Sequence, residues 1–171
     1  MLLISDCWKQ IIRVRHELAA FSNSPVPAPQ MGPPASPNEL RALERHLGLT
    51  LPPSYREFLS LYNGVENFVG DVALRSTHTI LAGEEDWLEE IAEEFPEFVK
   101  FCFAGDQHSY GDCYFFDPRH VAPDGEMEVV AVSLKMDEAR WPNFSVLLQD
   151  MLERLELALA AERSDREALS D

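Results

Sequence analysis

Four side chains of the kinds that bind zinc lie within one short stretch of the sequence: Cys102, His108, Cys113 and His120. Zinc sites usually present such ligands as closely spaced pairs of one residue type, and no two cysteines or two histidines are that close here. Cys102 and Cys113 also lie in apolar runs, where a free cysteine packs as a small hydrophobic side chain. We therefore predict no metal site and no cofactor.

Catalytic motifs are equally weak. The sequence contains no G-x-S-x-G segment, and Gly105 and Gly111 do not form a phosphate-binding glycine pattern. Asp106, His108 and Asp112 could together supply acid–base groups, but acidic residues in turns more often shape the turn. We predict a protein without catalytic residues, and an enzyme that uses these three side chains remains an alternative.

The helix expected over residues 84–95 carries a series of acidic residues without a basic residue among them. Trp87, Ile91 and Phe95 recur with helical spacing and would face inward, so the acids would cover the opposite side. Each pair of like charges at positions i and i+4 destabilises a helix by about 0.2–0.5 kcal/mol. The pattern favours a surface for a cationic partner, and a merely solvated helix face is the alternative. The acids are Glu84, Glu85, Asp86, Glu89, Glu90, Glu93, Glu94 and Glu97.

The whole chain shares this acidity. Its 171 residues include 30 Asp and Glu against 14 Lys and Arg, a formal net charge of −16. Such a field repels nucleic acids and anionic membranes and speeds the encounter with cationic proteins. The three cysteines are odd in number and widely spaced, which suits a reducing compartment better than a disulfide framework. No signal peptide or membrane span is recognisable, so we expect a cytoplasmic protein-binding domain.

The elements that would position these residues divide the chain into four parts. Residues 1–21 contain an amphipathic helix over 4–21, and residues 22–37 form a proline-rich linker in which a paired strand is not expected. The main domain covers residues 38–162, and a polar tail that frays covers 163–171. Whether the first helix packs on the main domain stays open.

The main domain begins with residues that are typical of the start and the end of a helix. Ser36 and Glu39 form an S-x-x-E capping box, and Gly48 suits the left-handed position after a helix. A second helix runs from Pro52–Pro53 to Asn63–Gly64. Strands or hairpins are then expected over 65–75, 99–103, 113–116 and 128–134, with loops over 104–111 and 117–125 and a closing helix over 143–162. This order predicts an α+β fold, an antiparallel sheet with helices packed around it.

The stretch LRALERHLGLTLPPSYREFLSLYNG, residues 40–64, resembles the opening of the SUKH superfamily, which includes the yeast Smi–Knr cell-wall regulators and many bacterial proteins. The matching positions are Leu47–Gly48, Leu51–Pro52, Tyr55, Phe58–Leu59 and Asn63–Gly64. FCFAGDQHSYGDCYFFD resembles the paired central strands of the family around a loop rich in Gly and Asp, and Phe144 and Leu148 match its closing helix. The resemblance covers about residues 36–160.

The resemblance implies a small sheet wrapped by helices, without catalytic residues. Many bacterial members look like immunity proteins that neutralise polymorphic toxins, often nucleases or deaminases with basic clefts. We therefore expect stoichiometric binding of a basic toxin domain. The alternative is a regulatory adaptor of the same fold that binds a cellular protein. The expected contact residues are Glu85, Glu89, Glu90, Glu93, Asp106 and Asp112.

Overall fold

A seven-stranded antiparallel sheet and a set of helices make up the fold, as the α+β prediction expected. The computed structural model describes residues 3–21, 27–69, 72–83, 93, 96, 99–106, 112–132 and 138–168. The strands are β1 (Gln30–Met31), β2 (Val65–Val69), β3 (Val72–Leu74), β4 (Cys102–Asp106), β5 (Cys113–Val121), β6 (Met127–Val132) and β7 (Glu138–Trp141). Each strand pairs with the next along the chain, the arrangement that short connections favour.

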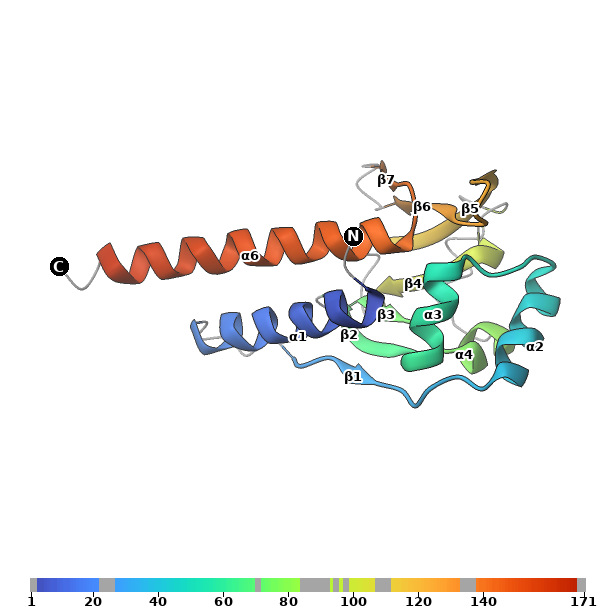
Figure 1. Ribbon diagram of the computed structural model, residues 1–171, viewed down its shortest axis with the longest axis horizontal. Coiled ribbons are helices and arrows are strands. Elements are labelled where there is room, and N and C mark those ends of the chain that lie inside the picture. The colour runs from blue at the N-terminus through green and yellow to red at the C-terminus, as the bar shows by residue number, and fades with distance from the viewer. Residues whose placement is uncertain are drawn as a thin grey trace.

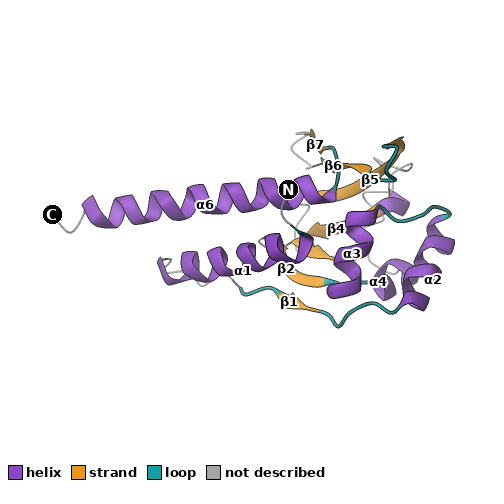
Figure 2. Cartoon of the chain, viewed as in Figure 1, coloured by secondary structure: helices purple, strands orange, loops and turns teal. Residues whose placement is uncertain are grey.

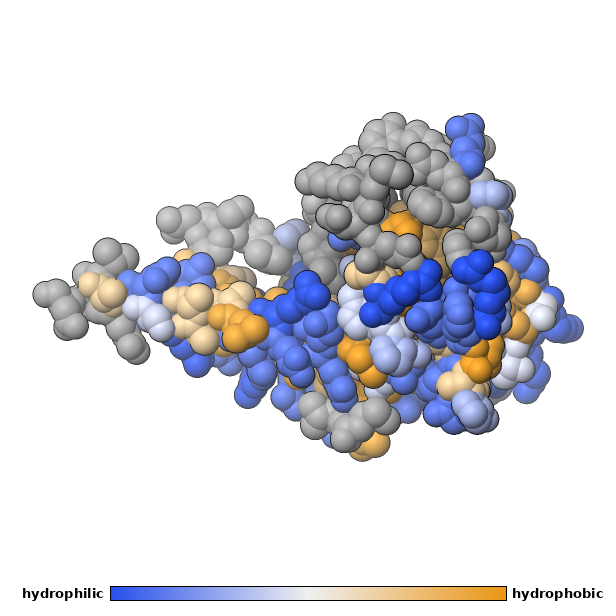
Figure 3. Space-filling view, turned by 90° about the horizontal axis from the view of Figure 1, so that it is seen from above, coloured by the Kyte–Doolittle hydropathy of each residue, from blue (hydrophilic) through white to orange (hydrophobic). Residues whose placement is uncertain are grey.

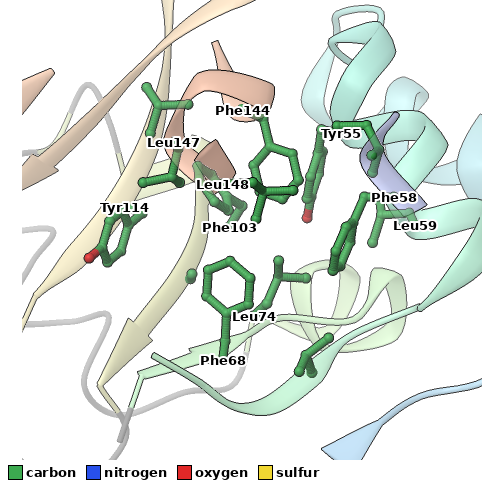
Figure 4. Close-up of a cluster of buried hydrophobic side chains, with 14 of the residues drawn as sticks. Tyr55, Phe58, Leu59, Phe68, Leu74, Phe103, Tyr114, Phe144, Leu147 and Leu148 are labelled. Carbon is green, nitrogen blue, oxygen red and sulfur yellow. The ribbon is translucent and has the colours of Figure 1, made fainter. Parts of the chain in front are cut away.

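The helices lie mainly on one side of this sheet (Figure 1). They are α1 (Ile4–Phe21), α2 (Pro37–Leu47), α3 (Pro53–Leu61), α4 (Thr77–Ala82) and α6 (Phe144–Ala168), with a 3₁₀ turn η1 (Val99–Phe101) before β4. Aromatic rings fill the space between α3, α6 and the sheet (Figure 4). Tyr55 lies 5.4 Å from Phe103 and 5.3 Å from Phe144, measured between ring centroids.

The first helix is part of this core, which answers the question that the sequence left open. Trp8 is fully buried, and its ring lies 5.4 Å from both Phe58 on α3 and Phe68 on β2. Arg15 is also buried, and its guanidinium donates to the carbonyl oxygens of Asn67, of Phe68 at 2.9 Å and of Pro27 at 3.0 Å. The amphipathic face of α1 therefore completes the core of the domain.

Beyond the sheet, α1 and α6 continue side by side as a helical projection, which we define as α1 together with the part of α6 after Met151 (Figure 1). Arg163 pairs with Glu17 at 2.6 Å, and the Arg166 guanidinium lies 4.6 Å from the centroid of the Phe21 ring. The frayed tail expected from residue 163 is wrong as far as Ala168, because α6 continues to that residue.

The proline-rich segment also packs against the body. Gln30 and Met31 form β1 and pair with Glu66 and Val65, so the expectation of no paired strand is wrong for these two residues. Prolines are tolerated there because β1 is an edge strand. Figure 2 shows the described residues on either side of β1, 27–29 and 32–36, as a loop that follows the body. A Cβ at Gly32 would lie 2.2 Å from the Asn63 carbonyl oxygen, so this close approach requires glycine.

The predicted ends of α2 are confirmed. Ser36 Oγ accepts from the Glu39 backbone N–H at 3.3 Å, and Glu39 Oε2 accepts from the Ser36 N–H at 2.8 Å. Gly48 ends α2 in the left-handed region with φ 73°. The hairpin over 65–75 is present as β2 and β3.

Other boundaries differ from the prediction. The strand expected from residue 99 begins at Cys102 after η1 and continues to Asp106, and β5 extends to Val121 through a predicted loop. The two elements α4 and β7 were not predicted. The helix expected over 84–95 lies outside the described residues, apart from Glu93.

Candidate functional site

Half of the six predicted contact residues lie outside the described part of the chain. Glu85, Glu89 and Glu90 belong to that group, and the structure tests no prediction about them. Glu93 is described and is exposed to solvent. The acidic helix surface over 84–97 remains a prediction, and Glu93 is its described member in an accessible position.

Asp106 and Asp112 lie at the end of the β4–β5 pair. Gly105 pairs with Cys113 in the register of these strands, and one further step brings the backbone of Asp106 opposite that of Asp112. Asp112 is exposed. Two of the predicted contact residues, distant by several positions in sequence, therefore lie on neighbouring backbone segments.

The two cysteines of the zinc-like set lie close together, and His120, the histidine of the set that the structure describes, lies elsewhere. Cys102 and Cys113 are buried with Phe115 in a small apolar cluster on the face of the sheet that points away from α3 and α6. Cys102 Sγ donates to the Ala104 carbonyl oxygen at 3.4 Å. His120 lies further along β5, where its ring is exposed, and His108 is outside the described residues.

A cluster of charged side chains follows that small apolar cluster on the same face of the sheet. Successive β5 side chains alternate between faces, so Asp117 shares the face of Cys113 and Phe115. Its partner in the strand register is Glu128 on β6. Arg140 on β7 pairs with Val130 and so reaches the same face. We call Asp117, Arg119, His120, Glu128 and Arg140 the β5–β7 ion cluster.

Asp117 is the centre of this cluster and is fully buried. Arg119 holds both carboxylate oxygens, with Nε 2.9 Å from Oδ1 and Nη2 2.8 Å from Oδ2. His120 Nδ1 lies 3.1 Å from Asp117 Oδ2 and 3.3 Å from Glu128 Oε2. The Arg140 guanidinium bonds Glu128 and lies 3.6 Å from Asp117 Oδ2. The cluster thus connects three neighbouring strands.

These contacts set the protonation of the buried acid. The hydrogen bonds from the Arg119 side chain hold the pKa of Asp117 well below its ordinary value, with a further contribution from His120, although burial acts in the opposite direction. A buried carboxylate that keeps its charge needs such partners. Asp117 is therefore ionised throughout the physiological pH range.

The ligand atoms of Asp117, His120 and Glu128 lie within 4.8 Å of one another, a spacing that could accommodate a cation. The two guanidiniums of Arg119 and Arg140 already neutralise the two carboxylates, however, and occupy their oxygen atoms. A metal ion would have to displace them. We interpret the cluster as a network of ion pairs that fixes the register of β5, β6 and β7.

A family comparison identifies the fold. The model of the SMI1 / KNR4 family (SUKH-1) matches residues 34–150, which include strands β2 to β7 and the helices from α2 to the first part of α6. The chain belongs to this family. The SUKH-1 match begins after α1 and β1 and ends near Met151, so both helices of the projection lie largely outside it.

One curated relative is similar over a shorter stretch. It is the "Uncharacterized protein YnaB" of Bacillus subtilis (strain 168), 39% identical over 64 residues, which make up 37% of this chain and 40% of the relative. The aligned region therefore spans about two fifths of that relative. Among the described residues, no helix is both long and apolar enough to cross a membrane.

Sequence reasoning missed the β5–β7 ion cluster because its members come from three strands. A signal was present: D-P-R-H follows the apolar run CYFF directly, and Glu128 opens the next strand. An acid that follows the buried apolar positions on one face of a strand needs a basic partner. The partner on β7 could not be found because β7 itself was not predicted.

Proposed function

We propose that this SUKH-1 domain is an immunity protein that neutralises a cognate toxin in the cytoplasm by stoichiometric, non-catalytic binding. The observation that carries the proposal is the net charge of −16 in a chain of this family. Self-repulsion of that size destabilises a compact state, so a cationic partner gives the acidity a role. Figure 3 shows that hydrophilic residues predominate over the described part of the body in that view.

The proposed partner is a basic toxin domain of the nuclease or deaminase type, whose substrate cleft is built for nucleic acid. An acidic surface that enters such a cleft occupies the positions of the phosphates. We assign the contact to Glu85, Glu89, Glu90, Glu93, Asp106 and Asp112. The exposure of Glu93 and Asp112 and the adjacency of the Asp106 and Asp112 backbones support this assignment.

A capture experiment tests the function. The full chain is immobilised, the lysate of its own organism is passed over it at about 0.05 M and about 1 M salt, and retained proteins are identified. The Debye length falls from about 14 Å to about 3 Å between these conditions, so a charge-driven complex should form at the lower salt only. We expect a basic protein that arrests growth when expressed alone and does not when co-expressed with this chain. Capture of a harmless protein, or of none, would contradict immunity.

A regulatory adaptor of the same fold is the second candidate, and the helical projection favours it. The projection lies largely outside the family match and carries Leu157, which is 71% exposed. Deleting residues 1–35 cannot separate the two functions, because Trp8 and Ala35 belong to the core. Substituting Leu157→Glu avoids that problem: an adaptor that uses the projection should lose its cellular partner, whereas an immunity protein should still neutralise its toxin.

A further inference from the structure

A shallow depression beside the C-terminal half of α2 differs in charge from the rest of this acidic protein. We call it the α2 depression, and it lies at the end of the molecule opposite the helical projection (Figure 1). Two of its lining residues, Arg41 and Arg45, are exposed arginines one helical turn apart. Its lining comprises Asn38, Arg41, Glu44, Arg45, Gly48, Leu49 and Thr50.

The one acid in this lining is already neutralised. Glu44 Oε1 accepts from the Arg56 guanidinium on α3 and from the Leu51 backbone N–H at 3.2 Å. Arg41 and Arg45 make only local hydrogen bonds, to Asn38 Oδ1 and to the Arg41 carbonyl oxygen. Within the described residues, neither arginine forms an ion pair, so the depression has a local positive charge.

A third cation reaches the same place from a distant part of the sequence. Lys100 lies on η1, and its Nζ is 3.9 Å from the position that a Cβ on Gly48 would occupy. Basic residues in the last turn of a helix are often explained by the helix dipole. The dipole favours any cation at this end of α2, including Lys100, but it does not account for Arg41, which lies before the last turn. The chain has only 14 Lys and Arg residues, so the convergence of three of them calls for an anionic ligand.

We propose that the α2 depression binds an acidic peptide segment of a partner protein. Positions i and i+4 of a helix are about 5–6 Å apart, so one carboxylate can bridge the guanidiniums of Arg41 and Arg45 in the forked geometry that arginine favours. Lys100 receives a second carboxylate, and the half-buried Leu49 contacts an apolar residue between them. At about 0.15 M salt the Debye length is about 8 Å, so a bound carboxylate interacts most strongly with these three nearby cations.

A peptide fits this surface better than a nucleic acid. A polynucleotide would extend its phosphates beyond the depression and across an acidic molecule, where they would be repelled. A short segment places its charges only where the cations are. The inference does not depend on the immunity function.

Fluorescence anisotropy at 0.15 M salt tests the proposal. The probe is a fluorescein-labelled peptide of alternating glutamate and leucine residues, and the full chain is the titrant. We expect the double variant Arg41→Glu/Arg45→Glu to bind about tenfold more weakly, and Lys100→Glu to weaken binding by a smaller factor. All three side chains are exposed, so both variants should fold; the double variant should melt at a slightly lower temperature, because an acid at position 45 opposes the α2 dipole.

The control is Lys9→Glu/Arg13→Glu, which makes the same change in net charge on two exposed residues of α1. It should bind the probe as the unmodified protein does. The proposal fails if the unmodified protein does not bind the probe, or if the two double variants weaken binding equally. It also fails if a peptide with glutamine in place of glutamate binds as well. Tighter binding of a short single-stranded oligonucleotide at the same residues would replace the peptide with a nucleic acid.

Discussion

Trp8 at the base of the helical projection is fully buried, whereas Arg163 near its far end keeps 56% of its side chain exposed. The two ends of one projection are thus held in different ways. Near the sheet, α1 and α6 supply aromatic and aliphatic side chains to the core. Further out, apolar contacts at Leu18 and Leu159 are joined by an exposed ion pair and by the stacking of Arg166 on Phe21. The difference shows that the fold requires the base of the projection, whereas its far end is an addition to the fold.

The largest effect is expected at the base of the projection. Replacing Trp8→Ala removes the ring that contacts Phe58 and Phe68 and leaves a cavity, so the free energy of unfolding should fall by about 3–5 kcal/mol. Chemical denaturation measures this loss. The neighbouring exposed substitution Lys9→Ala is the control and should change stability by less than about 0.5 kcal/mol. A loss below about 1 kcal/mol for Trp8→Ala would mean that α1 is an appendage.

The next effect concerns the opposite face of the sheet. Asp117→Asn keeps the shape but removes the charge that Arg119 and Arg140 neutralise. Losing one partner of a buried pair costs about 3–5 kcal/mol, and because these arginines are partly exposed we expect about 2 kcal/mol. The exposed substitution Glu153→Gln on α6 is the control.

The pH dependence of this difference has a definite sign. The pKa of Asp117 is lowered in the folded state, so its contribution is complete above the unfolded-state pKa of about 3.9 and is lost as the pH falls below that value. The gap in unfolding free energy between the unmodified protein and Asp117→Asn should therefore be constant from pH 7 to about 5 and narrow below pH 4. A gap that widens on acidification would contradict the ionised state of Asp117.

A smaller effect is expected at the start of α2. Ser36→Ala removes the acceptor for the Glu39 N–H, and loss of such a cap costs about 1 kcal/mol. Ser60→Ala is a matched control, because Ser60 is exposed and bonds only the Glu57 carbonyl oxygen in its own helix. Equal melting temperatures for the two variants would show that the capping box does not stabilise the domain.

The smallest effect is expected at the far end of the projection. Arg163 and Glu17 form an exposed pair at 2.6 Å, and such pairs contribute about 0.2–1 kcal/mol. A double-mutant cycle with Arg163→Ala and Glu17→Gln isolates their coupling. A coupling energy above about 2 kcal/mol would mean that the far end of the projection contributes to stability on the same scale as its base.

The same contrast explains how far the sequence predicted the structure. The ends of α2 were predictable because Ser36, Glu39 and Gly48 act on their own backbone neighbourhood. The helical pattern of α1 showed that one face is buried but not that Trp8 would meet Phe58 and Phe68, which lie about fifty positions later. The α4 helix was missed because it is short and carries few apolar residues, and β7 because a short edge strand that carries charged residues resembles a loop.

The candidate site divides in the same manner. The acidic series over 84–97 could be recognised because its charges are consecutive in sequence. The β5–β7 ion cluster and the α2 depression could not, because each depends on pairs that only the fold brings together, such as Asp117 with Arg140 and Gly48 with Lys100. Charged residues that are close in sequence could be recognised from the sequence, whereas contacts between residues distant in sequence could not.

The most direct test compares the affinity of the captured partner for two charge-reversal variants of the full chain. One is Glu85→Lys/Glu89→Lys/Glu93→Lys in the family-matched part, and the other is Glu153→Lys/Glu156→Lys/Glu162→Lys on exposed acids of the projection. Both change the net charge equally. Immunity through the acidic surface predicts that the first variant binds at least about tenfold more weakly at low salt while the second binds as the unmodified protein does. Loss of binding in the second variant alone would contradict that surface and favour an adaptor that uses the projection.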